Sequence, residues 1–209
     1  MLRRIMKQPH HRGFTIIELM VTIAIIAVVM FSAIPSMSTW LRNTQVRTAA
    51  ESLQAGLQKA RAEAVRRNTP VTFSLVSNNQ PGVLDNGCNL SSLSASWVVS
   101  VSNNPSGGCG QPVSESVAPQ ILAKYARGDG APNVTITVYQ EDCATVSNQT
   151  QTRFNGFGRI DNAEPIRCLL VDHDSGLEVR KLRLVIGTGG SVRMCDPAVT
   201  NDTDPRKCY

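Results

Sequence analysis

The sequence contains none of the short motifs that identify common enzyme classes. The nucleophile motif GxSxG, the zinc motif HExxH, the P-loop and the dinucleotide-binding glycine pattern are all missing. Histidine is scarce, and only His173 lies beyond the first 11 residues, within the run DHDSG at 172–176. A nucleophile, a base and an orienting acid usually come from separate elements of a fold. Adjacent residues on one tight turn cannot easily form their hydrogen-bonded series. Since Asp, Ser and Gly favour turns, the run predicts a hairpin turn in a non-enzyme without a cofactor.

Charged residues are almost absent from the stretch between Gly13 and Pro35, which reads GFTIIELMVTIAIIAVVMFSAIP. Between Phe14 and Ile34 only Glu18 is charged. A helix of that length rises about 31 Å, enough to cross a hydrocarbon core of about 30 Å. No small-x-small cleavage pattern of a secretory signal follows it, so we expect this transmembrane segment to stay attached.

Glu18 is the unusual residue in the apolar run. An ionisable side chain inside a membrane helix costs about 2.5–3.5 kcal/mol and normally has a partner. A protonated or snorkelling glutamate near the lipid headgroups explains its position equally well. Both interpretations stay open on position alone.

Basic residues are concentrated before the apolar run. Arg3, Arg4, Lys7 and Arg12 lie in the first 13 residues, where no acidic residue occurs. They account for most of the net charge of +5, so the rest of the chain is nearly neutral. Positive flanks remain cytoplasmic, which predicts a single-pass protein with its N-terminus in the cytoplasm and everything after Pro35 exported.

The N-terminal pattern resembles the class III signal of type IV pilins and type II secretion pseudopilins. It consists, in order, of a basic leader, Gly13-Phe14, Thr15, Glu18, the apolar run and Pro35. The resemblance implies that a prepilin peptidase cuts after Gly13 and that Phe14 becomes the N-methylated first residue. It also implies a filament core in which Glu18 pairs with the amine of a neighbouring subunit. Burial of both charges in an apolar core would favour that pairing.

All six cysteines lie in the exported part, and none forms a CxxC pair or a Cys/His cluster. An even number in an oxidising compartment indicates disulfides rather than zinc ligands, although zinc remains an alternative. Fifteen pairings are possible, and we favour nearest-neighbour order because each bond then closes a local loop. The favoured pairs are Cys88–Cys109, Cys143–Cys168 and Cys195–Cys208.

The remaining pattern predicts an α+β fold with one long N-terminal helix and a mainly antiparallel sheet. Apolar residues at three- and four-residue spacing continue the helix to about residue 67, bent or loosened near Pro35 and Gly56, with Leu53 and Leu57 under the sheet. Strands are expected at 71–76, 97–101, 121–125, 134–139, 167–171, 177–186 and 192–194. The resulting parts are a leader (1–13), a membrane and filament-core helix (14–35), its amphipathic continuation (36–69) and a periplasmic head (70–209).

Two later motifs resemble the GspH/FimT branch of this superfamily. They are RFNGFGR at 153–159 and LRLVIGTGGSVRMC at 182–195. The resemblance implies a minor pilin or pseudopilin of the bacterial inner membrane, with its filament position at the tip or in the priming complex. Its implied partners are other pilins, the prepilin peptidase and an inner-membrane assembly platform. Type IV pilus and type II secretion systems both remain open.

DNA binding is the alternative function, because some FimT-type members bind DNA through a Gly-Arg-x-Arg motif. This chain has GSVR at 190–193, so the first arginine is missing. Lys181, Arg183 and Arg193 nevertheless form a candidate phosphate-binding patch. A solvated sheet face is the favoured interpretation, because the exported part has little net charge. Asp196, Asp202 and Asp204 suggest calcium, but their spacing does not match an EF-hand loop, so no metal is expected.

Overall fold

The computed structural model describes residues 13–80 and 82–208, except for the side chains of residues 31–36. The chain forms two compact units, which divide between Trp40 and Leu41. One helix, α1 (Ile16–Arg67), passes through both. The second unit, the head, contains every strand: β1 (Val71–Ser77), β2 (Asn89–Leu90), β3 (Ser96–Ser100), β4 (Ile121–Tyr125), β5 (Val134–Tyr139), β6 (Gln151–Phe154), β7 (Cys168–His173), β8 (Leu182–Ile186) and β9 (Val192–Cys195).

Helix α1 buries one apolar face within the head. The predicted stripe at three- and four-residue spacing is fully buried, and so is Ala49 beside it; the stripe consists of Val46, Ala50, Leu53, Leu57, Ala60 and Ala64. The helix is continuous through Gly56. A Cβ at this position would lie only 2.8 Å from ring carbons of Phe73 and Trp97, so the absence of a side chain lets both rings pack against the helix. The helix ends where Asn68 adopts a positive φ of 51° before Pro70, which cannot continue it.

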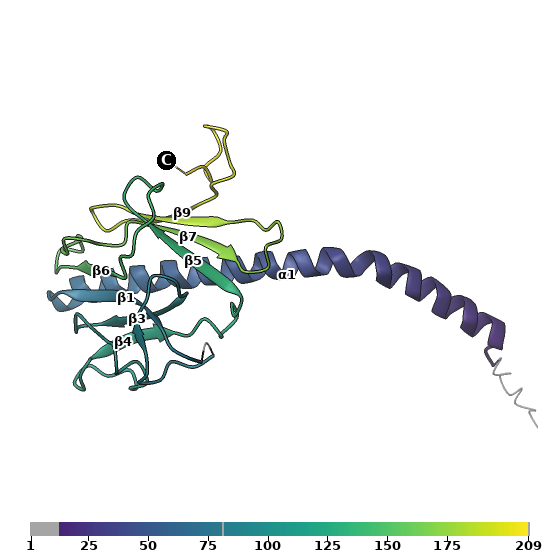
Figure 1. Ribbon diagram of the computed structural model, residues 1–209, viewed down its shortest axis with the longest axis horizontal. Helices are drawn as coiled ribbons and strands as arrows, with labels where there is room; N and C mark the ends of the chain where they lie inside the picture. The colour runs from purple at the N-terminus through teal and green to yellow at the C-terminus, as the bar shows by residue number, and fades with distance from the viewer. Residues whose placement is uncertain (1–12, 81, 209) are drawn as a thin grey trace, which may run out of the picture. The chain divides into compact units, whose positions relative to one another are not determined.

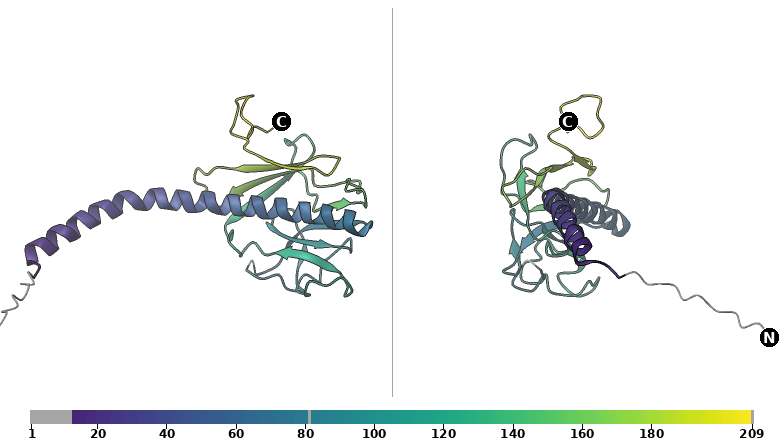
Figure 2. Two further views of the ribbon diagram at one scale, coloured as in Figure 1. Left: turned by 180° about the vertical axis from the view of Figure 1, so that it is seen from behind. Right: turned by 90° about the vertical axis from the view of Figure 1, so that its right-hand side faces the viewer.

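The strands form two antiparallel sheets rather than the single sheet that the pattern suggested. The first has the order β2-β1-β3-β4, with β6 also paired to β1, and the second has the order β5-β7-β8-β9. Figures 1 and 2 show both sheets lying against the head part of α1. The α+β prediction is confirmed, with the core distributed over two helix–sheet interfaces.

The main core joins these layers through large buried side chains. Leu53 and Leu57 of α1 belong to one cluster with Phe73 of the first sheet and with Leu169 and Leu184 of the second. Both sheets, both apolar clusters and all three disulfides lie within residues 41–209. The head therefore contains a complete core of its own.

Three details of the strand prediction differ from the structure. β2 is only two residues long, and β6 (QTRF) has a single large apolar residue, Phe154, so neither produces a clear alternating pattern. β8 begins at Leu182 instead of residue 177, because Leu177 is 57% exposed and contributes nothing to a core face. Burial decides these boundaries, and burial depends on the partner strands.

Candidate functional site

The N-terminal segment begins α1 with a defined cap. The Thr15 hydroxyl accepts a hydrogen bond from the Glu18 backbone N–H at 3.3 Å, and the Leu19 N–H donates to the Thr15 carbonyl at 3.1 Å. Threonine is a favoured N-cap, and glutamate three residues later matches the capping-box spacing. The bond between Gly13 and Phe14 lies before the helix, and Phe14 is 81% exposed. The sequence interpretation missed this cap, although the T-x-x-E spacing indicates it.

Most of the described side chains that follow Phe14 are apolar and exposed. Ile16, Ile17, Met20 and Val28 are each more than 60% exposed. A contiguous apolar surface of this kind marks a site of contact with lipid or with protein. Within the part of the chain that the structure describes, no helix is long and apolar enough to cross a membrane. The side chain of Pro35, which the sequence assigns to filament assembly, lies outside the described residues.

The six cysteines form three disulfides in nearest-neighbour order. Cys88–Cys109, Cys143–Cys168 and Cys195–Cys208 close loops with sequence separations of 21, 25 and 13 residues. All six thiols are used, so none remains to ligate zinc. The sulfur atoms of the first pair lie in a small second core beneath the first sheet.

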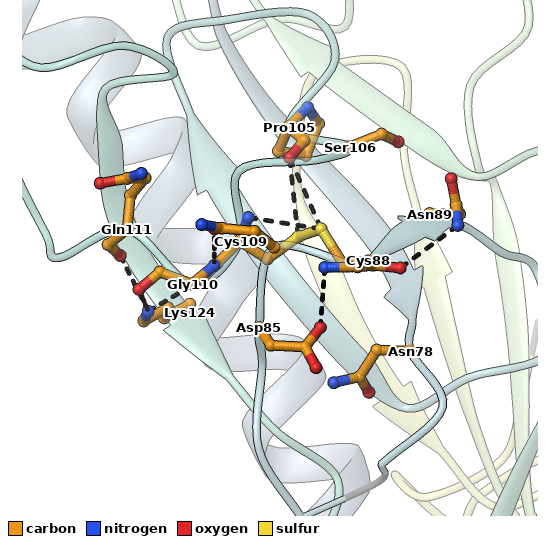
Figure 3. The surroundings of a disulfide bond; sticks show 12 residues. Asn78, Asp85, Cys88, Asn89, Pro105, Ser106, Cys109, Gly110, Gln111 and Lys124 are labelled. Carbon is orange, nitrogen blue, oxygen red and sulfur yellow. Dashed lines mark hydrogen bonds between the residues drawn. A yellow bond between two sulfur atoms is a disulfide. The ribbon is translucent and has the colours of Figure 1, made fainter.

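The loop around Cys109 also binds a side chain of β4. Lys124 donates from Nζ to the carbonyls of Cys109 and Gln111 at 2.8 Å and to that of Gly110 at 3.3 Å, as Figure 3 shows. On the other side of the disulfide, the Asn86 side chain accepts from the Gly110 N–H at 3.0 Å. The disulfide and these bonds fix the loop against β4, the last strand of the first sheet.

Two of the three candidate DNA-binding cations already bind protein groups. Lys181 Nζ lies 2.6 Å from the Asp172 carboxylate. Arg193 donates to the backbone carbonyls of Pro205 and Lys207 at 3.1 and 2.8 Å. The Nε of Arg183 is buried and finds no hydrogen-bond acceptor among the described residues. The three residues thus do not present a set of free cations.

The acidic residues of the last loop are likewise paired with cations. Asp196 accepts from Arg180 at 2.7 Å, and Asp202 pairs with Lys207. A hydrogen bond from Arg206 lowers the pKa of Asp204 to about 2. No cluster of His, Cys, Asp or Glu that could hold a metal is present in the described part of the chain.

His173 is the last residue of β7 and is nearly buried against α1. Its Nε2 lies 3.2 Å from the Gln45 side-chain oxygen, and its Nδ1 accepts from the Ser175 N–H at 3.1 Å. The turn that the sequence predicts follows it directly. Nε2 thus attaches the end of β7 to the helix, and Nδ1 holds the first residues of the β7–β8 turn.

The chain matches models of two known protein families. A family model described as "Type II transport protein GspH" matches residues 49–206, which cover most of the head. The chain belongs to the GspH family. A second model, the prokaryotic N-terminal methylation motif, matches residues 8–34. Together the two matches make the chain a minor pilin or pseudopilin, a member of a family of structural subunits that assemble with other pilins in filaments.

Solved structures similar to this GspH-family chain include the type IV minor pilin FimU of Pseudomonas aeruginosa in two crystal forms. The two matches have 18% sequence identity, cover 78% of this chain and 95% or 99% of the other, and have TM-scores of 0.45 and 0.43. A search of curated proteins finds no significant match.

The two motifs of the GspH head meet at the end of α1. In the loop 155–159 the Asn155 side chain accepts from the N–H groups of Phe157 and Arg159, and the Gly158 carbonyl accepts from Arg61 Nε at 3.1 Å. Gly190, from the second motif, lies against that same carbonyl. The motifs therefore attach both sheets to the last turns of the helix.

A carboxylate cluster stabilises the same end of α1. Glu63 contacts Lys59, Arg66 and Arg67 at 2.8–3.0 Å, and the two arginines also bind Glu115. The hydrogen bond from Lys59 is the largest influence and lowers the pKa of Glu63 to about 2, although burial opposes it. Glu115 links the helix end to the loop before β4, which is an arrangement that no spacing in the sequence reveals.

We expect this cluster to make the stability of the head depend on pH. The folded-state pKa of Glu63 lies below its ordinary value of 4.5, so its contribution is complete above about pH 5 and is lost as pH falls toward 2. Glu63→Gln should cost about 1.5 kcal/mol at pH 7. It should also make the decline in stability between pH 5 and pH 2 shallower.

Urea unfolding of oxidised residues 41–209 at a series of pH values measures both effects. The matched control is Glu51→Gln, which removes an exposed pair with Arg47 and should cost less than about 0.5 kcal/mol. Parallel pH curves for the wild type and Glu63→Gln would contradict this assignment.

Proposed function

We propose that the chain is made as a prepilin, is cut between Gly13 and Phe14, and is N-methylated at Phe14. The observation that carries the proposal is the match of residues 8–34 to the N-terminal methylation motif, joined through α1 to a GspH head. The peptide bond before Phe14 lies outside the helix, and the capped helix begins immediately after it. Both features suit recognition of the precursor by a peptidase.

In this proposal residues 14–35 anchor the precursor in the bacterial inner membrane and later form the filament core. The apolar, exposed side chains after Phe14 support contact with lipid first and with neighbouring subunits afterwards. The leader stays cytoplasmic and the head lies in the periplasm, where its three disulfides are stable. An assembly platform in the inner membrane would move the subunit from the lipid bilayer into the filament.

The family description favours a type II secretion pseudopilus over a type IV pilus as the filament. The head is held rigid by disulfides and by the motif contacts at the end of α1, which suits a subunit that works by packing. We place it at the tip or in the priming complex, together with other minor subunits.

Processing is tested by mass spectrometry of the protein isolated from cells that contain its peptidase. Wild-type protein should begin at methylated Phe14. Gly13→Leu should leave the leader attached, whereas Gly82→Leu, at a glycine with open space around it, should be processed normally. Detection of the intact leader on wild-type protein in such cells would refute the proposal.

DNA uptake is the second function that the sequence allows, and it stays a prediction. Because Lys181 and Arg193 already contact protein groups, we expect the head to bind duplex DNA weakly and without sequence preference. Fluorescence anisotropy over a salt series measures this. Tight binding that Arg183→Ala or Arg193→Ala abolishes, with Arg47→Ala as a control, would instead establish a DNA-binding pilin.

A further inference from the structure

The loop at 155–159 presents one aromatic side chain to solvent from a rigid backbone. Phe157 is 84% exposed, although its own N–H and that of Arg159 are held by the Asn155 side chain. Gly158 adopts a positive φ of 72°, and its N–H donates to the Asn155 carbonyl at 2.8 Å. An exposed phenylalanine on a pre-formed loop loses little conformational entropy when it is buried by a partner.

One apolar side chain and two arginines lie at or next to the loop that carries Phe157. Val65, which is 52% exposed, lies beside Gly158, where a Cβ would meet its methyl group at 3.0 Å. Arg61, which binds the Gly158 carbonyl, and Arg159 of the same loop are both exposed, and neither side chain is paired with a carboxylate in the described part of the chain. We call these four residues the Phe157 patch.

The β7–β8 turn at the other end of the head has the complementary character. Leu177 is 57% exposed, and Asp174 and Glu178 beside it are exposed carboxylates. The nearby cations Arg180 and Lys181 are already paired with Asp196 and Asp172. The turn therefore presents an apolar residue within an acidic rim, which we call the Leu177 turn.

The two surfaces lie at opposite ends of the head part of α1. His173 attaches the Leu177 turn near Gln45, whereas Arg61 binds the loop of the Phe157 patch. Sixteen residues of helix separate these anchors, a distance of about 24 Å. Figures 1 and 2 show the β7–β8 turn where α1 enters the head, and β6 with its following loop near the end of the helix.

We infer that the Phe157 patch docks a neighbouring pilin subunit, at an end of that subunit's head which carries an apolar residue beside carboxylates. The inference rests on the proposed function. The Leu177 turn of this chain shows what such a surface looks like on the same fold. If the neighbouring subunit carries its acidic surface at the same end as this chain does, the contact is head-to-tail, the kind that propagates along a filament instead of closing a dimer. Aromatic and arginine side chains are enriched in interface cores.

The test is photo-crosslinking of the full-length chain in cells that contain its assembly system. Benzoylphenylalanine replaces Phe157, and the control places it at Leu93, which is 73% exposed elsewhere on the head. We expect the adduct of position 157 with another processed pilin to exceed that of position 93 at least fivefold. Arg159→Glu should lower the yield about tenfold, whereas Arg127→Glu should not change it.

Peptide mapping of the adduct decides the chemistry of the contact. An attachment point beside Asp or Glu residues of a second pilin supports the inference, and so does recovery of the Arg159→Glu adduct when one of those carboxylates becomes lysine. A yield that Arg159→Glu leaves unchanged overturns it. If the chain is processed and co-purifies with pilins but position 157 gives no adduct, the docking inference fails and the proposed function stands. If the chain is neither processed nor associated with pilins, both fail.

Discussion

Replacing Gly190 with alanine is expected to destabilise the head by about 3 kcal/mol or more. Gly190 has a positive φ of 79°, a conformation that costs an L side chain about 1–2 kcal/mol. The added Cβ would also lie 2.1 Å from the Gly158 carbonyl oxygen. That oxygen belongs to the backbone and is already bound to Arg61, so it cannot move aside without loss of a second contact.

Gly189→Ala is the matched control for this prediction. Its Cβ would meet no atom within 4 Å, and its φ is not positive, so the change should stay within about 0.5 kcal/mol. Urea unfolding of oxidised residues 41–209 compares the two variants. Equal midpoints would show that the contact between the two sequence motifs contributes nothing to stability.

Glu18→Ala is expected to leave processing intact and to reduce incorporation into filaments at least tenfold. The proposed partner of Glu18 is the amine of a neighbouring processed subunit, inside an apolar core. Removing one member of a buried ion pair costs about 3–5 kcal/mol, because the remaining charge loses its compensation. Immunoblots of sheared filaments against the membrane fraction measure the ratio.

Glu18→Gln separates the charge from the helix cap. Glutamine keeps a hydrogen-bond acceptor at the capping-box position but carries no charge. If the ion pair is the cause, Glu18→Gln should fail to assemble as Glu18→Ala does. Normal assembly of the glutamine variant would assign Glu18 to the cap that Thr15 begins, and normal assembly of both variants would contradict a role for Glu18 in the filament.

The sequence alone predicts much of the helix and of the strand set. The stripe that includes Leu53 and Leu57 repeats every three to four residues, so its burial against the strands follows from the helical period. The strands 121–125 and 134–139 are found with the same bounds, because clear turn residues flank them. β6 was missed, because a strand with one apolar residue is recognised only when a neighbour buries Phe154.

By itself, the sequence determined the class of protein, because the family resemblance rests on local motifs. The N-terminal methylation motif, the apolar run and the even number of cysteines are local or compositional patterns, which can be read without knowledge of the fold. Only the tertiary structure decided which basic side chains are bound by other groups of the protein. Lys181 and Arg193 are engaged, whereas Arg61 and Arg159 pair with no carboxylate in the described part of the chain, and Phe157 in the same loop as Arg159 is exposed. Pairing and exposure depend on residues up to a hundred positions apart, such as Arg61 and Gly158, which only the packing of both sheets on α1 brings together.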